Sequence, residues 1–182
     1  MNIKDIKKHF PIFEQKINGK SLVYLDSANS SQKPKKVIDS LNKFYSEDFA
    51  NVGRGIYTLA ANASEQYENT RLALKKFINA SDESEIIFTK NSTESLNLVA
   101  SCYGSKFINE GDEIISTELE HHANFVPWHF LRKKKGAVIK FLEIDDKGNL
   151  KIEDLEKLIT KKTKIISLTH MSNVTGTIVD IK

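Results

Sequence analysis

Short apolar runs alternate along this chain with longer segments of helical periodicity, and this alternation limits the folds open to it. Strand-like apolar runs lie near residues 22–25, 85–89, 113–117, 138–142 and 165–168. Segments with apolar residues at helical spacing lie near residues 34–49, 59–78, 92–102, 127–135 and 152–160. This order predicts an α/β fold with a mostly parallel sheet and helices on both faces.

The composition is that of an ordinary soluble globular protein, with 40% hydrophobic and 28% charged residues. The 182 residues suffice for one domain with a hydrophobic core. No apolar run approaches the ~20 residues that span a bilayer, and the N-terminus lacks the apolar core of a secretory signal. We therefore expect a cytoplasmic protein without a membrane partner.

Charge and cysteine content exclude several classes of function. The chain has 27 basic and 24 acidic residues, and the net charge of +3 gives no reason to expect nucleic-acid binding. The single cysteine, Cys102, excludes an internal disulfide framework and a cysteine-rich zinc site, and we expect no metal site. Because Cys102 follows Val99 on the apolar face of an expected helix, we expect its thiol to be buried and unreactive.

Polar residues follow three of the expected strands, and the carboxyl ends of parallel strands meet at one edge of a sheet. The first strand end runs through Ser92 and Thr93 directly into a helix. Free N–H groups at a helix start bind anions, so these residues could hold a phosphate, although Ser92 could equally be a simple N-cap. No glycine-rich Walker or dinucleotide motif is present.

The second and third strand ends carry histidine and amide side chains. Residues 120–124 read Glu-His-His-Ala-Asn, and neighbouring histidines on extended backbone point in opposite directions. Either histidine could stack on a planar ligand and exchange protons, or both could be satisfied by backbone hydrogen bonds. Asn173 lies in the third polar stretch, which could also be an ordinary loop. Together the three ends predict one shared crevice.

These segments, in this order, resemble the N-terminal half of pyridoxal-phosphate (PLP) enzymes of the class V aminotransferase family. The resemblance is strongest to the cysteine desulfurase and selenocysteine lyase branch. It covers nearly the whole chain, and its most specific part is Glu-His-His-Ala-Asn at 120–124 with Val-Pro-Trp at 126–128. The other matching residues are 24–28, 31–34, 54–55, 77–80, 92–94, 97–100, 169–170, 172–174 and 176–177.

The resemblance implies the large domain of the type I PLP-dependent transferase fold, in truncated form. Residues 1–20 would be an N-terminal arm, which belongs to the small domain in the family. Residues 21–182 would be the first half of the PLP-binding large domain.

The resemblance also implies roles for residues of the cofactor site. Thr93, with the backbone of Ser92, would hold the cofactor phosphate. His121 would stack on the pyridine ring and take part in proton transfer, and Asn173 would lie near the phenolic oxygen of the ring. PLP is the electron sink in such enzymes, while the protein anchors and orients the cofactor and controls its protonation.

Substrate contacts are implied for Ala28, Asn29 and Arg54, which match the family where its chain approaches the substrate amino acid. Two histidines that are frequent near this arginine are replaced by Gly53 and Tyr57, so their role is not carried over. The phosphate turn also departs from the family's usual Arg-Gly-Thr-Thr-Glu, since residues 90–94 read Lys-Asn-Ser-Thr-Glu.

The implied activity is conversion of L-cysteine to L-alanine, with transfer of persulfide sulfur to an acceptor protein for iron–sulfur cluster assembly. L-Selenocysteine is the other substrate that the resemblance implies. The family acts as a homodimer. The Schiff-base lysine and the nucleophilic cysteine of the family have no counterpart in this chain, so we expect the chain alone to be inactive. Two alternatives stay open: a related PLP-dependent lyase, epimerase or aminotransferase, or a non-catalytic remnant that needs a separate second half.

Overall fold

The computed structural model describes residues 2–181 and divides the chain into two compact units. The first unit ends at Ile87 and the second begins at Phe88. The predicted boundary near residue 20, between an arm and the large domain, stays a prediction. Within residues 2–181, no helix combines the length and the apolar character that a membrane crossing requires.

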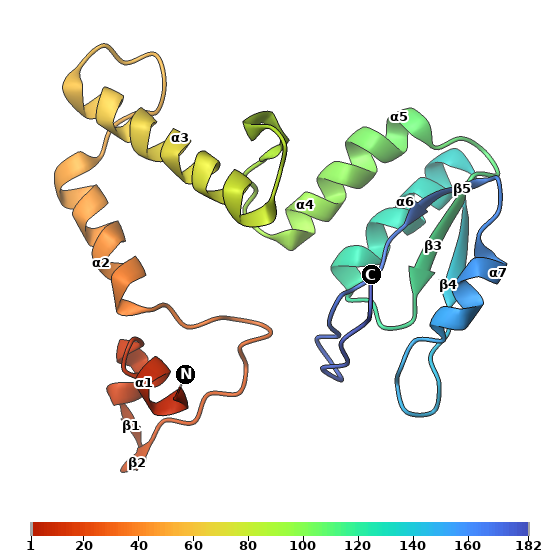
Figure 1. Cartoon of the computed structure of the whole chain (residues 1–182), viewed down its shortest axis with the longest axis horizontal. Helices are drawn as coiled ribbons and strands as arrows, with labels where there is room; N and C mark the ends of the chain where they lie inside the picture. Colours follow the sequence, from red (N-terminus) through yellow and green to blue (C-terminus); the bar gives the residue numbers. More distant parts are fainter. Residues whose placement is uncertain (1, 182) are drawn as a thin grey trace. The chain divides into compact units, whose positions relative to one another are not determined.

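The first unit is mainly helical (Figure 1). Its elements are α1 (Ile3–Lys7), η1 (Pro11–Glu14), β1 (Lys16–Ile17), β2 (Lys20–Ser21), α2 (Lys35–Lys43), η2 (Phe44–Asp48), α3 (Thr58–Ile78) and η3 (Glu83–Glu85). Strands β1 and β2 pair antiparallel through a two-residue turn, Asn18 and Gly19, which both have positive φ, as a type I′ hairpin turn requires. The longest helix, α3, buries Ala60 and Ala63 and ends at Asn79 in the left-handed conformation.

Two expected strands of the sequence analysis are wrong. Residues 22–25 and 85–89 are not strands in the structure, and neither segment has a hydrogen-bonded strand partner among residues 2–181. Glu85 is instead the last residue of η3. Apolar β-branched and aromatic residues make extended backbone favourable, but a strand forms only where a neighbouring strand accepts its hydrogen bonds.

The second unit contains the parallel sheet. Its elements are α4 (Ser92–Val99), η4 (Ala100–Gly104), α5 (Ser105–Phe107), β3 (Glu113–Thr117), η5 (His122–Asn124), α6 (Val126–Lys135), β4 (Val138–Leu142), η6 (Ile152–Asp154), α7 (Leu155–Leu158) and β5 (Thr163–Ile166). The strands lie in the order β4-β3-β5, and both pairs are parallel. Ile114 of β3 lies opposite Ile139 of β4 and Ile165 of β5.

Each face of this sheet has its own apolar core, and α6 and α7 lie on opposite faces (Figure 1). On the α6 face, Ile114 packs with Trp128 and Leu131 of the helix. On the other face, Leu142 packs against Leu155 and other apolar residues that follow β4. The predicted α/β class, with a parallel sheet covered on both faces, is therefore confirmed.

Two predictions about single residues in this unit have opposite outcomes. Gly136 ends α6 with a φ of 72°, after a last turn of four basic residues, so the helix ends where the segment expected at 127–135 ends. Cys102 is exposed, so the predicted buried thiol is wrong. The buried side of this helical segment runs through Ala100 and Gly104, four residues apart, and Cys102 lies between them on the other side.

Candidate functional site

A cavity of about 450 Å³ lies in the second unit, beyond the ends of β3 and β5. It is lined by Ser92, Ser95 and Leu96 of α4, by Glu120, His121, Ala123 and Asn124 after β3, and by Leu168 and Thr169 after β5. All three polar segments singled out in the sequence therefore contribute to one cavity, and two of them follow parallel strands of the sheet, β3 and β5.

Glu120 ties the end of β3 to the segment that follows β5. Its Oε1 accepts hydrogen bonds from Thr117 Oγ1 and from the backbone N–H of Thr169, both at 2.7 Å. Its Oε2 accepts a hydrogen bond from Asn124 Nδ2 at 2.7 Å. A carboxylate with three such donors is held in one place, so Glu120 forms part of the cavity wall rather than a free acid or base.

Asn124 extends this network from the other side. Its Oδ1 accepts hydrogen bonds from Ser167 Oγ at 2.6 Å and from Trp128 Nε1 at 3.3 Å. The network therefore joins α6, the end of β5 and the short helix η5. The sequence showed the carboxylate and the amide but gave no sign of this scaffolding role, because their partners lie up to 49 residues away along the chain.

His121 is the N-cap residue of η5 and also lines the cavity. Its Nδ1 accepts a hydrogen bond from the backbone N–H of Ala123 at 3.1 Å. In the neutral ring, Nε2 therefore carries the proton. His122 lines a different cavity, of about 400 Å³, with Phe125 and Phe141. The two histidines line different cavities, but they do not point in opposite directions as predicted: His122 begins η5, and the two ring centroids are 6.1 Å apart.

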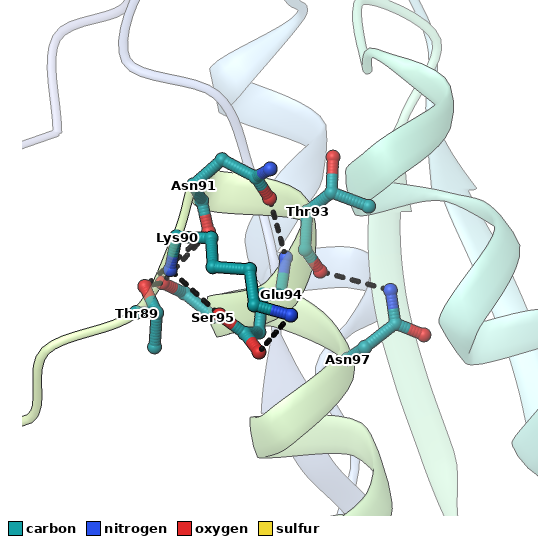
Figure 2. Close-up of polar contacts among 7 residues, drawn as sticks. All are labelled: Thr89, Lys90, Asn91, Thr93, Glu94, Ser95 and Asn97. Carbon is teal, nitrogen blue, oxygen red and sulfur yellow. Dashed lines mark hydrogen bonds and ion pairs between the residues drawn. The ribbon is translucent and has the colours of Figure 1, made fainter.

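The start of α4 is capped by Asn91, so the suggestion that Ser92 is the N-cap is wrong. Asn91 Oδ1 accepts a hydrogen bond from the backbone N–H of Glu94 at 3.0 Å (Figure 2). The Glu94 carboxylate accepts a hydrogen bond from the backbone N–H of Lys90 at 2.6 Å. Helical geometry leaves the N–H groups of Ser92 and Thr93 without intrahelical acceptors, which is the arrangement that binds an anion.

Thr93 contributes its backbone to the helix and leaves its hydroxyl available. Its carbonyl oxygen accepts a hydrogen bond from Asn97 Nδ2 at 2.8 Å. Figure 2 shows no contact between the Thr93 hydroxyl and the other residues drawn. Ser92 lines the cavity, whereas Thr93 lies next to it in the chain and outside the lining set.

The remaining predicted residues are not brought into this cavity. Asn173 is exposed and lies in a turn. Ser172, just before it, is buried, and its hydroxyl accepts hydrogen bonds from the backbone N–H groups of Val174 and Thr175. Ala28, Asn29 and Arg54 all belong to the first unit and are exposed. Of the predicted site residues, the cavity therefore brings together Ser92 and His121, and the roles of all of them stay predictions.

Comparison with known proteins begins with the family. The family model described as aminotransferase class V matches residues 23–182. A probable cysteine desulfurase from Halalkalibacterium halodurans is 48% identical over 182 residues, which is 100% of this chain and 45% of that protein. A probable cysteine desulfurase from Staphylococcus aureus is 49% identical over 175 residues, 96% of this chain and 42% of that protein.

Solved structures give the same result. The cysteine desulfurase of Thermococcus onnurineus, in its apo form, superimposes with a TM-score of 0.89 at 38% identity, over 100% of this chain and 43% of that one. The cysteine desulfurase CsdA of Escherichia coli superimposes with a TM-score of 0.82 at 35% identity, over 100% and 44%. The chain spans less than half the length of these relatives. By sequence and by fold, it belongs to the class V aminotransferase family.

Proposed function

We propose that this chain is the N-terminal part of a PLP-dependent cysteine desulfurase. The complete protein would convert L-cysteine to L-alanine and pass persulfide sulfur to an acceptor protein for iron–sulfur cluster assembly. The observation that carries the proposal is the cavity in which the start of α4 and His121 meet, in a chain 48% identical to a probable cysteine desulfurase. L-Selenocysteine is the second candidate substrate, because the resemblance extends to selenocysteine lyases.

The residues around this cavity fit PLP. The N–H groups of Ser92 and Thr93, with their hydroxyls, form a donor set suited to the phosphate. The exposed His121 ring lines the same cavity and is available to stack on a pyridine ring. The lining contains one carboxylate, that of Glu120, and three hydrogen bonds hold it in a fixed position in the cavity wall. When bound, PLP supplies the electron sink for the reaction.

The protein's own contribution is to bind, orient and control protons. The bond from the Ala123 N–H to His121 Nδ1 leaves the Nε2–H to act as a donor. Asn173 is proposed to contact the phenolic oxygen of the cofactor. In the other unit, Ala28, Asn29 and Arg54 are proposed to contact the substrate amino acid.

We expect the chain alone to bind the cofactor weakly and to have no cysteine desulfurase activity. The Schiff-base lysine and the nucleophilic cysteine would come from the part of the relatives that this chain does not match. We also propose a cytoplasmic homodimer as the working form of the complete protein.

The test begins with a titration of the 182-residue chain with PLP, followed by quenching of its single tryptophan. Trp128 donates a hydrogen bond to the cavity residue Asn124, so a ligand in the cavity should quench its fluorescence. Pyridoxal, which lacks the phosphate, is the matched control and should bind at least tenfold more weakly, since charged hydrogen bonds contribute roughly 1.5–3 kcal/mol. Equal affinities would contradict the phosphate assignment.

A second experiment tests the reaction. The chain would be joined to the C-terminal part of the Halalkalibacterium halodurans relative, and alanine release from L-cysteine would be measured. The joined protein should form alanine and the chain alone should not. A joined protein that binds PLP but racemises or transaminates amino acids would favour one of the related enzymes instead.

A further inference from the structure

The short segment that contains His121 is fixed at both of its ends. Glu120 comes directly before His121 and Asn124 three residues after it, and Asn124 Nδ2 donates a hydrogen bond to Glu120 Oε2 at 2.7 Å. Within the segment, the N–H of Asn124 donates to the carbonyl oxygen of His121 at 2.8 Å. His121 therefore lies in a turn that is closed twice, once by the backbone and once by a pair of side chains.

Both ends of this turn are also attached to the segment that follows β5. The N–H of Thr169 donates to Glu120 Oε1 at 2.7 Å, and the hydroxyl of Ser167 donates to Asn124 Oδ1 at 2.6 Å. Thr169 lines the same cavity as His121. Because one carboxylate joins the two lining segments, it fixes the distance between them.

The His121 ring depends on this support, since it has little of its own. The ring is exposed, and in the described part of the chain it makes one hydrogen bond, from the N–H of Ala123 to Nδ1 at 3.1 Å. A residue that contacts a ligand must be held to within roughly 0.5 Å and 10–20° of its working geometry, usually by hydrogen bonds of the residues around it. Glu120 and Asn124 provide such bonds on either side of His121.

We propose that Glu120 and Asn124 are positioning residues, which hold the His121 ring where it stacks on the pyridine ring of PLP. The proposal rests on the proposed function, in which His121 stacks on the cofactor. Glu120 and Asn124 act through His121 in this role and need no contact with the cofactor. Their effect on binding therefore cannot exceed the effect of removing the His121 ring.

The direction of each hydrogen bond gives the test its design. An ionised glutamate has only acceptor atoms, whereas an asparagine amide has both an acceptor and a donor. In Glu120→Gln, a new NH₂ group faces the NH₂ group of Asn124, and in Asn124→Asp two carboxylates face each other. The double exchange Glu120→Gln/Asn124→Asp reverses the bond between the two residues. The new amide oxygen keeps both donors of Oε1, the new carboxylate keeps both donors of Oδ1, and the net charge is unchanged.

The first measurement is a titration of the 182-residue chain with PLP, followed by the absorbance of the cofactor because Trp128 itself donates to Asn124. Glu120→Gln and Asn124→Asp should each alter the spectrum of bound PLP as His121→Ala does. Each should weaken binding by up to about two- to tenfold, the contribution of ring stacking. The double exchange should restore the wild-type spectrum and affinity, and a double exchange as weak as the single ones would overturn the proposal.

Glu118→Gln is the matched control for these exchanges. Glu118 is a carboxylate two residues before Glu120, but its Oε2 accepts a hydrogen bond from the N–H of Ile144 at 3.1 Å, and it lines the other cavity. Its exchange should leave the spectrum and the affinity unchanged. Charge alone does not explain a common loss, because Glu120→Gln removes a negative charge whereas Asn124→Asp adds one.

The second measurement tests whether the effect acts through His121. In a His121→Ala background, Glu120→Gln should change PLP affinity by less than about twofold, because the ring that it positions is absent. Two losses that simply add would show that Glu120 acts on the cavity in another way, and the positioning role would be wrong.

Ser167→Ala keeps the proposal testable if the exchanges at 120 and 124 prevent folding. It removes one hydroxyl that donates to Asn124 and leaves the bond between Glu120 and Asn124 in place. A melting curve shows whether the variant is folded. The folded variant should bind PLP about two- to fivefold more weakly, the effect of one lost hydrogen bond. Wild-type affinity and spectrum in this variant would overturn the proposal.

The outcomes distinguish the two proposals. If His121→Ala changes the spectrum of bound PLP and the folded variants at 120, 124 and 167 do not, the positioning role is wrong and the proposed function stands. If the wild-type chain binds no PLP, the proposed function is wrong and the positioning role with it.

Discussion

The tautomer of His121 decides what this residue can do in the cavity. The N–H of Ala123 donates to Nδ1, so Nε2–H is the group left to meet a ligand. We predict that His121→Ala will change the absorption spectrum of PLP bound to the chain. It should also weaken binding roughly two- to tenfold, since ring stacking contributes about 0.5–1.5 kcal/mol. His122→Ala, which alters a different cavity, is the control. An unchanged spectrum would argue against ring stacking.

Thr93 tests the anion site separately from the ring. Its side chain has no role in the Asn91 cap or in the Glu94 contact, so Thr93→Ala should leave the helix start folded. We predict that PLP affinity will fall roughly tenfold or more, as expected for a lost hydrogen bond to a charged phosphate. Thr93→Ser keeps the hydroxyl and should bind almost normally. If Thr93→Ala and wild type give the same PLP titration curve, Thr93 does not bind the cofactor phosphate.

Single residues of the site were predictable where the residue type and its position after an apolar run were sufficient to identify them. Ser92 and His121 both follow apolar runs and line the same cavity, although only the run before His121 is a strand of the sheet. The cap was assigned one residue late, because Asn91 and Ser92 are both good caps and only backbone geometry distinguishes them. The bond between Glu120 and the Thr169 N–H depends on a chain reversal that residue spacing does not reveal.

At the level of elements, the spacing of apolar residues along the sequence predicted the positions of most strands and helices. Strands β3, β4 and β5 and helices α3, α4 and α6 formed within a few residues of their predicted positions. Apolar residues of β3, β4, β5 and α6 belong to the core clusters, whereas no residue of α3 or α4 does. The segments at 22–25 and 85–89 have the same composition but no paired strand. Whether a segment becomes a strand depends on a second segment that pairs with it, and the sequence of the first segment does not specify that partner.

An ion pair at the amino end of β3 links three elements of the sheet. Glu113 Oε2 lies 2.8 Å from Lys140 Nζ of β4 and accepts hydrogen bonds from the hydroxyls of Thr160 and Thr163. The hydrogen bond from Lys140, followed by those from the two threonines, holds the pKa of the Glu113 carboxyl below its ordinary value of 4.5. The side chains of Glu113 and Lys140 are only 12% and 25% exposed.

This pKa shift gives a stability prediction with a definite sign. A carboxyl whose pKa is lowered by folding stabilises the folded state above its ordinary pKa, and that contribution is lost as pH falls through the lowered folded value. Glu113→Gln should therefore lower the melting temperature at pH 7, and its difference from wild type should shrink below pH 4.5. Glu143→Gln removes an exposed ion pair with Lys151 and should have little effect at either pH. A Glu113→Gln deficit that grows on acidification would reverse the sign and contradict the assignment.

The molecule as a whole exposes more apolar surface than a self-sufficient domain normally does. Among the described residues, Leu25, Ile56, Phe77 and Val174 are each more than 80% exposed. Strands β4 and β5 each have one edge without a strand partner in residues 2–181. The chain also spans only 42–45% of its curated relatives. Unpaired edges and exposed apolar patches are the features through which chains associate.

We therefore predict that the 182-residue chain, expressed alone, will self-associate and bind a hydrophobic dye such as ANS. Co-expression with the C-terminal part of the Halalkalibacterium halodurans relative should suppress both effects, because that part would supply the strands and helices that cover these surfaces in a complete family member. Light scattering coupled to size exclusion gives the mass of each species, and an unrelated domain of similar size serves as the co-expression control. A monodisperse monomer that does not bind the dye would show instead that the chain is an autonomous unit, and the non-catalytic alternative would then become the stronger one.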